Sequence, residues 1–125
     1  MSDKNAFDCV FDHLAAGDVS AALEWLSPDA HIWHCFDRVA HDREGTASEW
    51  AAFIANFPER AFTEVRSQAS AKGFVRQHLM TVRTANGKRM AWEVCVIVEM
   101  DGGRIRRLDE YIDRAGSFVP DDAAQ

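Results

Sequence analysis

Cysteine is scarce in this sequence. The 125 residues include three cysteines, Cys9, Cys35 and Cys95, which is an odd number, and no two of them have CxxC spacing. Each lies among apolar neighbours, so we interpret all three as small buried side chains rather than as reactive thiolates. A disulfide framework is therefore excluded. A chain of this length buries roughly two thirds of its unfolded surface, which is enough for a core without disulfides.

Clustered positive charge and long apolar runs are also missing. The chain has 14 basic against 20 acidic residues, for a net charge of −6. Its densest basic group, Arg104, Arg106 and Arg107, is short and interrupted, whereas a protein that neutralises phosphates needs a basic face. No run approaches the roughly 18 apolar residues of a membrane span, and the first residues lack the apolar centre of a signal peptide. We therefore expect a cytoplasmic protein that binds neither nucleic acid nor membrane.

Hydrophobic residues make up 47% of the chain, and their spacing predicts three helices in its first half. Apolar residues recur with helical spacing in three segments, which end at Gly17, before Pro28 and before Pro58. Asp18 and Thr46 are placed to cap the second and third helices. An aromatic and β-branched run between these two helices is typical of a strand. The expected elements are helices over residues 6–16, 19–26 and 47–57 and a strand over residues 31–36.

The second half predicts an antiparallel sheet. Strand-like runs cover residues 62–71, 74–85, 88–100 and 104–114, and the Asn-Gly and Asp-Gly pairs between them are strong hairpin signals. Helices grouped before a run of strands indicate an α+β fold, with the helices on one face of a curved sheet. We expect a single domain over residues 1–125, with a core over 6–114 and a small acidic tail over 115–125 that frays from Gly116 onward.

Strand alternation shows which polar residues share a face. In residues 88–100 both faces are apolar enough to be covered, and Glu93 shares one face with Cys95 while Trp92 and Val94 share the other. A carboxylate in a strand that is buried on both sides must be paired, hydrogen-bonded or protonated. Alternation alone does not say which face points inward.

Several short motifs accompany this order of elements: Ala16-Gly17-Asp18-Val19, Pro28-Asp29-Ala30-His31-Ile32-Trp33-His34, Gly45, Asp101-Gly102-Gly103-Arg104-Ile105 and Glu110-Tyr111-Ile112-Asp113. Together they resemble the nuclear transport factor 2-like superfamily, in particular its SnoaL-like and ketosteroid isomerase-like members. The resemblance covers residues 6–114. It implies a cone-shaped fold, in which a bent, mostly antiparallel sheet wraps around the N-terminal helices and leaves a deep pocket. It also implies a homodimer through the convex sheet face, for which Trp92 and Val94 are expected to be the apolar patch.

The resemblance also implies site residues. His34 falls where the isomerases have a general-base aspartate, and Glu93, at the end of Ala91-Trp92-Glu93, falls where they have a protonated, oxyanion-binding aspartate. Val10 falls where they have a catalytic tyrosine, so that hydrogen-bond donor is missing.

A second resemblance, to limonene-epoxide hydrolase-like enzymes, places Arg76-Gln77-His78 at their Arg-x-Asp pair and Glu110 at an acid of their closing motif. His78 replaces one of their two aspartates. The expected catalytic residues facing one cavity are His34, His78, Glu93, Arg76 and Glu110. The expected substrate-binding residues are Val10, Leu14, Ile32, Phe36, Trp50, Phe53, Met80, Cys95, Leu108 and Ile112.

Such a set of residues in an apolar cone predicts acid/base chemistry. His34 or His78 would take a proton from a carbon acid or from water, and Glu93 or Arg76 would stabilise the developing oxyanion. We expect isomerisation, cyclisation, dehydration or epoxide hydration of a small apolar, oxygenated molecule, without an organic cofactor. The alternative is a non-catalytic module that binds a hydrophobic ligand or a partner protein. Five ionisable side chains inside the cone would favour chemistry, whereas one or two would favour binding.

A metal site is a weaker hypothesis, and we expect none. His31 and His34 have chelating spacing, but on a strand their imidazoles face opposite sides. His34, His78 and Glu93 would form a two-histidine, one-carboxylate set suited to a transition metal, yet they come from separate strands. A purely structural Arg76–Glu93 pair is a further alternative.

Overall fold

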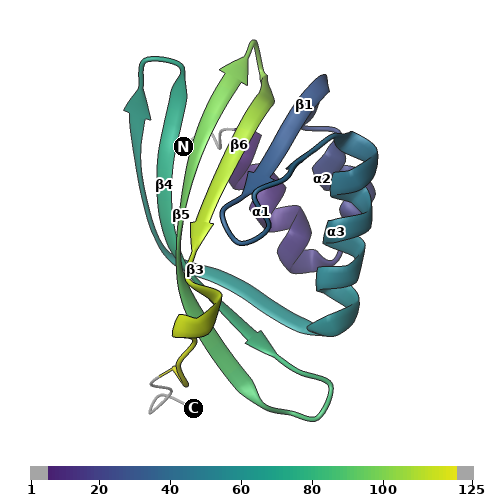
Figure 1. Ribbon diagram of the computed structural model, residues 1–125, viewed down its shortest axis with the longest axis vertical. Coiled ribbons are helices and arrows are strands. Elements are labelled where there is room, and N and C mark those ends of the chain that lie inside the picture. Colours follow the sequence, from purple (N-terminus) through teal and green to yellow (C-terminus); the bar gives the residue numbers. More distant parts are fainter. Residues whose placement is uncertain (1–5, 121–125) are drawn as a thin grey trace, which may run out of the picture.

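The computed structural model describes residues 6–120, which form one bent sheet with helices on its concave side (Figure 1). The sheet has six strands in the order β2-β1-β6-β5-β4-β3. The helices are α1 (Ala6–Ala16), α2 (Val19–Leu23) and α3 (Arg43–Asn56), and the strands are β1 (Leu26–His34), β2 (Ala40–His41), β3 (Glu59–Ser70), β4 (Gly73–Arg83), β5 (Arg89–Asp101) and β6 (Arg104–Ile112). The expected α+β fold, with a bent sheet around the N-terminal helices, is therefore confirmed.

The first helices begin and end close to where the sequence predicts. Gly17, with a φ of 81°, takes the left-handed conformation that ends α1. The Asp18 side chain then caps α2 by accepting a hydrogen bond from Ala21 N at 3.0 Å. Helix α2 is shorter than expected and ends at Leu23, because the chain from Leu26 onward pairs with β6 instead. A register shift after Leu26 accommodates Pro28 within the strand.

Helix α3 starts one turn earlier than expected. Asp42, rather than Thr46, is its N-cap, and its side chain accepts a hydrogen bond from Gly45 N at 2.8 Å. Thr46 is fully buried inside the helix. The expected cap at Thr46 is therefore wrong, because the Asp42 carboxylate directly after strand β2 already caps the helix one turn earlier. The two-residue strand β2 itself was not predicted.

The four-stranded meander forms as predicted, and two irregularities bend it. The β3–β4 pairing shifts register between Thr63 and Arg66, and Glu64 has a φ of 53° there. The β5–β6 pairing shifts between Glu99 and Met100. Such bulges increase local twist and bend a strand. They help to curve the sheet over the helices.

The inward face of β5 is the opposite of the one expected. Trp92, Val94, Val96 and Val98 are all buried against the helices. Their partners in β6 include Glu110 and Leu108, which pair with Val96 and Val98 respectively. Directly paired residues share a face, so the inward face of β6 fixes that of β5. The expectation that Trp92 and Val94 form a convex dimer patch is wrong.

The chain beyond β6 is more ordered than expected. Residues Arg114–Gly116 form a short 3-10 helix, η1. Phe118 then bridges Ala91, with backbone hydrogen bonds of 2.8 and 3.0 Å in the two directions. The predicted fraying from Gly116 is therefore wrong as far as Phe118, and residues 121–125 lie outside the described part of the chain. Within residues 6–120 no helix is long and apolar enough to cross a bilayer.

Candidate functional site

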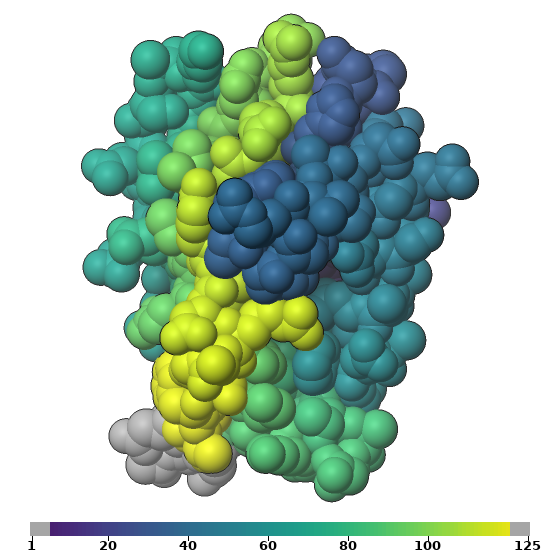
Figure 2. Space-filling view, viewed as in Figure 1, coloured from purple at the N-terminus to yellow at the C-terminus, as the bar shows by residue number. Residues whose placement is uncertain are grey.

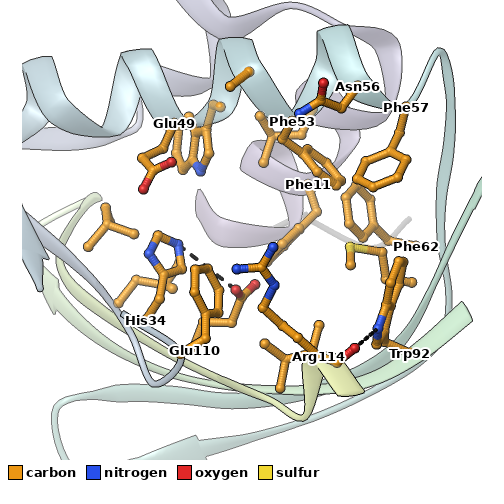
Figure 3. Close-up of a pocket in the computed structure, with 18 residues that line it drawn as sticks. Phe11, His34, Glu49, Phe53, Asn56, Phe57, Phe62, Trp92, Glu110 and Arg114 are labelled. Carbon is orange, nitrogen blue, oxygen red and sulfur yellow. Dashed lines mark hydrogen bonds and ion pairs between the residues drawn. The ribbon is translucent and has the colours of Figure 1, made fainter. Parts of the chain in front are cut away.

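A cavity of about 240 Å³ lies between the concave face of the sheet and the helices (Figure 3). In the space-filling view, a narrow hollow separates the dark blue segment after β1 and the yellow C-terminal segment from the teal helix α3 (Figure 2). The cavity is lined by Phe11, Leu14, Ile32, His34, Phe36, Glu49, Trp50, Ala52, Phe53, Asn56, Phe57, Phe62, Met80, Trp92, Leu108, Glu110, Ile112 and Arg114.

One part of the cavity is a cluster of aromatic rings. Phe11 of α1 lies 5.0 Å from Phe62 of β3, measured between ring centroids. Phe57, at the end of α3, lies 5.6 Å from Phe53 and 6.1 Å from Trp92 of β5. These rings come from four different elements and pack mostly edge to face, which is a favoured geometry for aromatic pairs. They provide a rigid apolar wall.

The other part is polar and is built on two neighbouring strands. His34 of β1 and Glu110 of β6 are directly paired in parallel register, so their side chains point the same way. The distance between His34 Nε2 and Glu110 Oε1 is 3.9 Å (Figure 3). The two side chains are only 9% and 20% exposed. This separation is too long for a hydrogen bond, so each group can still bind a third atom.

Burial shifts the protonation of both groups. It raises the pKa of Glu110 to about 7, although the nearby Arg114 charge opposes this rise. It lowers the pKa of His34, against the pull of the Asp37 and Glu49 carboxylates. At neutral pH the imidazole is therefore largely neutral, while the carboxyl group is close to half protonated. One group can accept a proton and the other can donate one.

Arg114 brings a cation to this end of the cavity. Its guanidinium lies 4.4 Å from the centre of the Phe36 ring, and the His34 ring stacks on the same Phe36 at 4.8 Å. The Arg114 backbone carbonyl accepts a hydrogen bond from the Trp92 indole nitrogen at 3.1 Å. Figure 3 shows its side chain reaching into the cavity beside Glu110. Arg114 was not predicted as a site residue, although it is the last residue of the strand expected over residues 104–114.

Helix α3 adds two polar residues that were not predicted from the sequence. Glu49 and Asn56 line the cavity, and Glu49 Oε1 lies 3.3 Å from His41 Nε2. They are seven residues apart, on the same helical face as Trp50, Phe53 and Phe57. That spacing was visible in the sequence, but only the apolar members of the face were considered.

The predicted site residues do not all meet in this cavity. Of the five expected catalytic residues, His34 and Glu110 line it, whereas Arg76, His78 and Glu93 do not. Eight of the expected wall residues line it: Leu14, Ile32, Phe36, Trp50, Phe53, Met80, Leu108 and Ile112. Val10 is instead fully buried in the core against the sheet, and Cys95 lies on the other face of β5.

Arg76 and His78 form a separate buried cluster beneath α1. Arg76 donates to Asp8 Oδ1 and, through Nε, to His78 Nδ1 at 3.1 Å. The guanidinium lies 4.4 Å from the Phe11 ring centre, and His78 packs edge-on against Phe11 and Phe62. Burial, with the adjacent Arg76 charge, lowers the pKa of His78 to about 3. His78 is therefore held neutral behind the cavity wall.

Glu93 lies on the convex face of the sheet, with Cys35, Cys95 and Tyr111 around a shallow second pocket. The expectation that Glu93 faces the cavity is wrong. The pairing of β5 with β6 turns Trp92 and Val94 inward, so Glu93 between them points outward. No Arg76–Glu93 pair is formed by this arrangement, and His34, His78 and Glu93 are not brought together as a metal-binding set.

The sequence matches the profile of the SnoaL-like domain over residues 8–108. A protein with a ketosteroid isomerase-like fold from Catenulispora acidiphila, solved in complex with trimethylamine, has a TM-score of 0.81 at 11% identity, covering 95% of this chain and 96% of its own. A candidate polyketide cyclase from Xanthomonas campestris has a TM-score of 0.76 at 14% identity, covering 86% and 87%. TerC, co-crystallised with polyporic acid, has a TM-score of 0.76 at 14% identity, covering 88% and 90%.

No curated protein sequence matches this chain at a significant level.

Proposed function

This chain belongs to the SnoaL-like domain family, and from that premise we propose that it is an enzyme of acid/base chemistry on a small, mainly apolar, oxygenated compound. Four ionisable side chains line the cavity: His34, Glu49, Glu110 and Arg114. That number is closer to the five expected of a catalytic cone than to the one or two expected of a binding module. The aromatic wall would hold the apolar part of the substrate.

The observation that carries the proposal is the gap between His34 and Glu110. Their side chains face each other across 3.9 Å in the cavity wall. A substrate atom at ordinary hydrogen-bond distance from both groups, about 2.8 Å, fits this gap. A proton can then leave the substrate at one group and enter it at the other, without a movement of the backbone.

The reaction class that suits these groups begins with a carbon acid. Neutral His34 takes a proton from the carbon beside a carbonyl group, the C–H bonding electrons move into the carbonyl, and the oxygen becomes an enolate. Protonated Glu110 or the Arg114 guanidinium stabilises that oxygen. Return of the proton to another carbon completes an isomerisation. In a dehydration, the proton held by His34 passes to a hydroxyl group on the next carbon, which leaves as water while the enolate electrons form the carbon–carbon double bond. Arg114 takes the role that was expected of Arg76.

A non-catalytic binding module remains the second candidate. The observation that favours it is the aromatic lining, since seven of the residues around the cavity are aromatic: Phe11, Phe36, Trp50, Phe53, Phe57, Phe62 and Trp92. Such a wall binds apolar ligands without chemistry.

We also propose that two copies associate through the convex sheet face. Ile97 and Tyr111 are 45% and 44% exposed there, and Tyr111 packs against Trp33 at 5.4 Å between ring centres. An exposed apolar patch of this kind is typical of an interface. Light scattering should give the mass of a dimer, and Ile97→Lys should give that of a monomer. A wild-type monomer would contradict this interface.

Hydrogen–deuterium exchange tests the catalytic proposal even when the product is unidentified. EDTA-treated protein in D2O is incubated with a panel of apolar ketones, and loss of the α-proton signal is followed by NMR. We expect acceleration by the wild type and by His31→Gln, whose histidine is exposed on the same strand, but not by His34→Gln. Ligand binding by all three proteins with no exchange would instead support the binding module.

A further inference from the structure

Four potential metal ligands lie together at the edge of the cavity. They include His34 but not Glu110. They are His34 at the end of β1, Asp37 in the turn, His41 in β2 and Glu49 in α3. Each contributes one ligand atom, and these atoms all lie within 4.8 Å of one another. The short β1–β2 hairpin brings three of them together, and α3 follows it directly. Only His34 was expected to be functional.

The distances suit a small cation. Asp37 Oδ2 lies 2.8 Å from His41 Nε2 and 3.9 Å from His34 Nδ1, and Glu49 Oε1 lies 3.3 Å from His41 Nε2. A tetrahedral zinc ion with bonds of about 2.0 to 2.1 Å places its ligand atoms about 3.3 to 3.4 Å apart. These three separations bracket that value, and the other pairs of ligand atoms lie within 4.8 Å.

A second and independent observation comes from His34. The residue is 7% exposed, and within residues 6–120 its Nδ1 is buried with no hydrogen-bond partner. A buried polar atom without a partner destabilises the fold. This lone pair faces Asp37 at a distance too long for a hydrogen bond. A cation between the two groups would satisfy both.

The surroundings also fit a metal-bound histidine. Metal-ligating histidines commonly donate their second ring nitrogen to a carboxylate, which fixes the ring. Here Nε2 of His34 faces Glu110 Oε1. The Asp37 carboxylate is itself oriented, because its Oδ1 accepts a hydrogen bond from Val39 N at 2.9 Å. That leaves Oδ2 directed at the two histidines.

We propose that His34, Asp37, His41 and Glu49 form a binding site for a divalent transition-metal ion. Two imidazoles favour such an ion over calcium or magnesium, which prefer oxygen ligands alone. Two carboxylates neutralise its charge. Since His34 and Glu49 also line the cavity, the ion lies next to any bound substrate. A metal on Nδ1 keeps the proton of His34 on Nε2, so metal binding and the proposed acid/base step are alternative uses of this histidine.

Zinc binding to the whole chain tests this site without reference to activity. EDTA-treated protein is equilibrated by dialysis against Zn2+, and the bound metal is counted. We expect one ion per chain. Changes in the second shell alone weaken metal sites about 10- to 100-fold, so His41→Ala and Asp37→Ala should lose at least that much affinity. His31→Ala is the matched control and should bind as the wild type does.

NMR of the wild type keeps the test valid even if a variant fails to fold. Zinc should shift the His34 Nδ1 and His41 Nε2 signals and leave those of His31 unchanged. The proposal is overturned if no zinc binds, or if His31→Ala loses as much affinity as His41→Ala. The cluster would then be an ion pair of His41 with its two carboxylates. The exchange assay uses EDTA-treated protein and the zinc assay uses no substrate, so either proposal can fail alone.

Discussion

Two buried histidines, His34 and His78, have opposite surroundings at nearly the same depth. They are 7% and 2% exposed. His34 opens on the cavity, and its nearest charged groups are the carboxylates of Glu110 and Asp37, both 3.9 Å away. His78 accepts a hydrogen bond from Arg76 at 3.1 Å, and the rings of Phe11 and Phe62 cover it. Carboxylates attract a proton to the first histidine, whereas a guanidinium repels one from the second.

This contrast separates a reactive group from a structural one. Each histidine has one buried ring nitrogen without a hydrogen-bond partner among residues 6–120, Nδ1 of His34 and Nε2 of His78. His34 lines the cavity, so a ligand can reach it. His78 is bonded to Arg76 through its other nitrogen and lies behind the cavity wall, with a pKa of about 3. Residue type and burial are alike in the two clusters. The sign of the neighbouring charge and access to the cavity make the difference.

The largest expected effect is on catalysis. In the exchange assay, His34→Gln should lose about 10²- to 10⁴-fold of the rate, the usual contribution of a general base. His78→Gln should change the rate by less than about tenfold, since His78 does not line the cavity. Circular dichroism checks that both variants are folded. An equal loss in two folded variants would show that the sealed cluster takes part in the reaction.

The next effect is on stability in acid. Below pH 6.5 the unfolded chain protonates His78 while the folded chain does not, until its pKa of about 3 is reached. The unfolded state then binds more protons, so this stabilisation is lost as the pH falls from 6.5 toward 3. The loss is on the order of 4 kcal/mol. Urea unfolding across this range should show a shallower acid decline in His78→Gln than in the wild type.

Removal of the central cation of the sealed cluster should also destabilise the fold. Arg76→Met deprives Asp8 and His78 of the guanidinium that binds both of them, and breaking a buried pair costs about 3 kcal/mol. Arg114→Met is the matched control, because its side chain is exposed and should cost less than about 1 kcal/mol. Urea midpoints measure both. The reverse order would mean that Arg114, and not Arg76, supports the fold.

Glu110 should show the opposite dependence on pH to that of His78. Its folded pKa of about 7 lies above the ordinary value of 4.5, so between these values the folded state binds the extra proton. Stability from this group is present below pH 4.5 and is lost as the pH rises toward 7, by on the order of 3 kcal/mol. In EDTA-treated protein, Glu110→Gln should abolish this decline. A decline that persists in the variant would assign it to another group.

The smallest expected effect comes from the hydrogen bond that holds the Arg114 backbone in place. Trp92→Phe removes the indole hydrogen bond to the Arg114 carbonyl and should cost about 1 kcal/mol of unfolding free energy. The exchange rate should fall severalfold as Arg114 loses its position. The conservative ring keeps the contact with Phe57, so a much larger loss of stability would mean that packing, and not the hydrogen bond, depends on Trp92.

The sequence was sufficient for the order of elements and for most of the cavity wall, because periodicity and turn residues are local signals. Of the residues that the resemblance implied, His34 and Glu110 line the cavity. It failed at Glu93 and Cys95, since β5 is apolar on both faces and its inward face is fixed only by its pairing with β6. Arg76 and His78 share the inward face of β4 with Met80, but α1 covers them. Long-range packing of that kind leaves no pattern in a single strand.

Arg114 and the His41 cluster were missed for another reason. Both depend on short segments, η1 and β2, whose conformation is set by what they pack against rather than by their own composition. A search for polar residues at each end of the predicted strands would have included Arg114.

The parallel pairing of β1 with β6 has a consequence for how the protein is made. Cys35 and Ile112, hydrogen-bonded beside the His34–Glu110 pair, are 77 residues apart in sequence, and β6 lies in the interior of the sheet between β1 and β5. Contacts of such separation form late, because a long loop must close first. During synthesis the emerging chain can form its helices and hairpins early. The part of the cavity that contains His34 and Glu110 forms only when β6 pairs with β1.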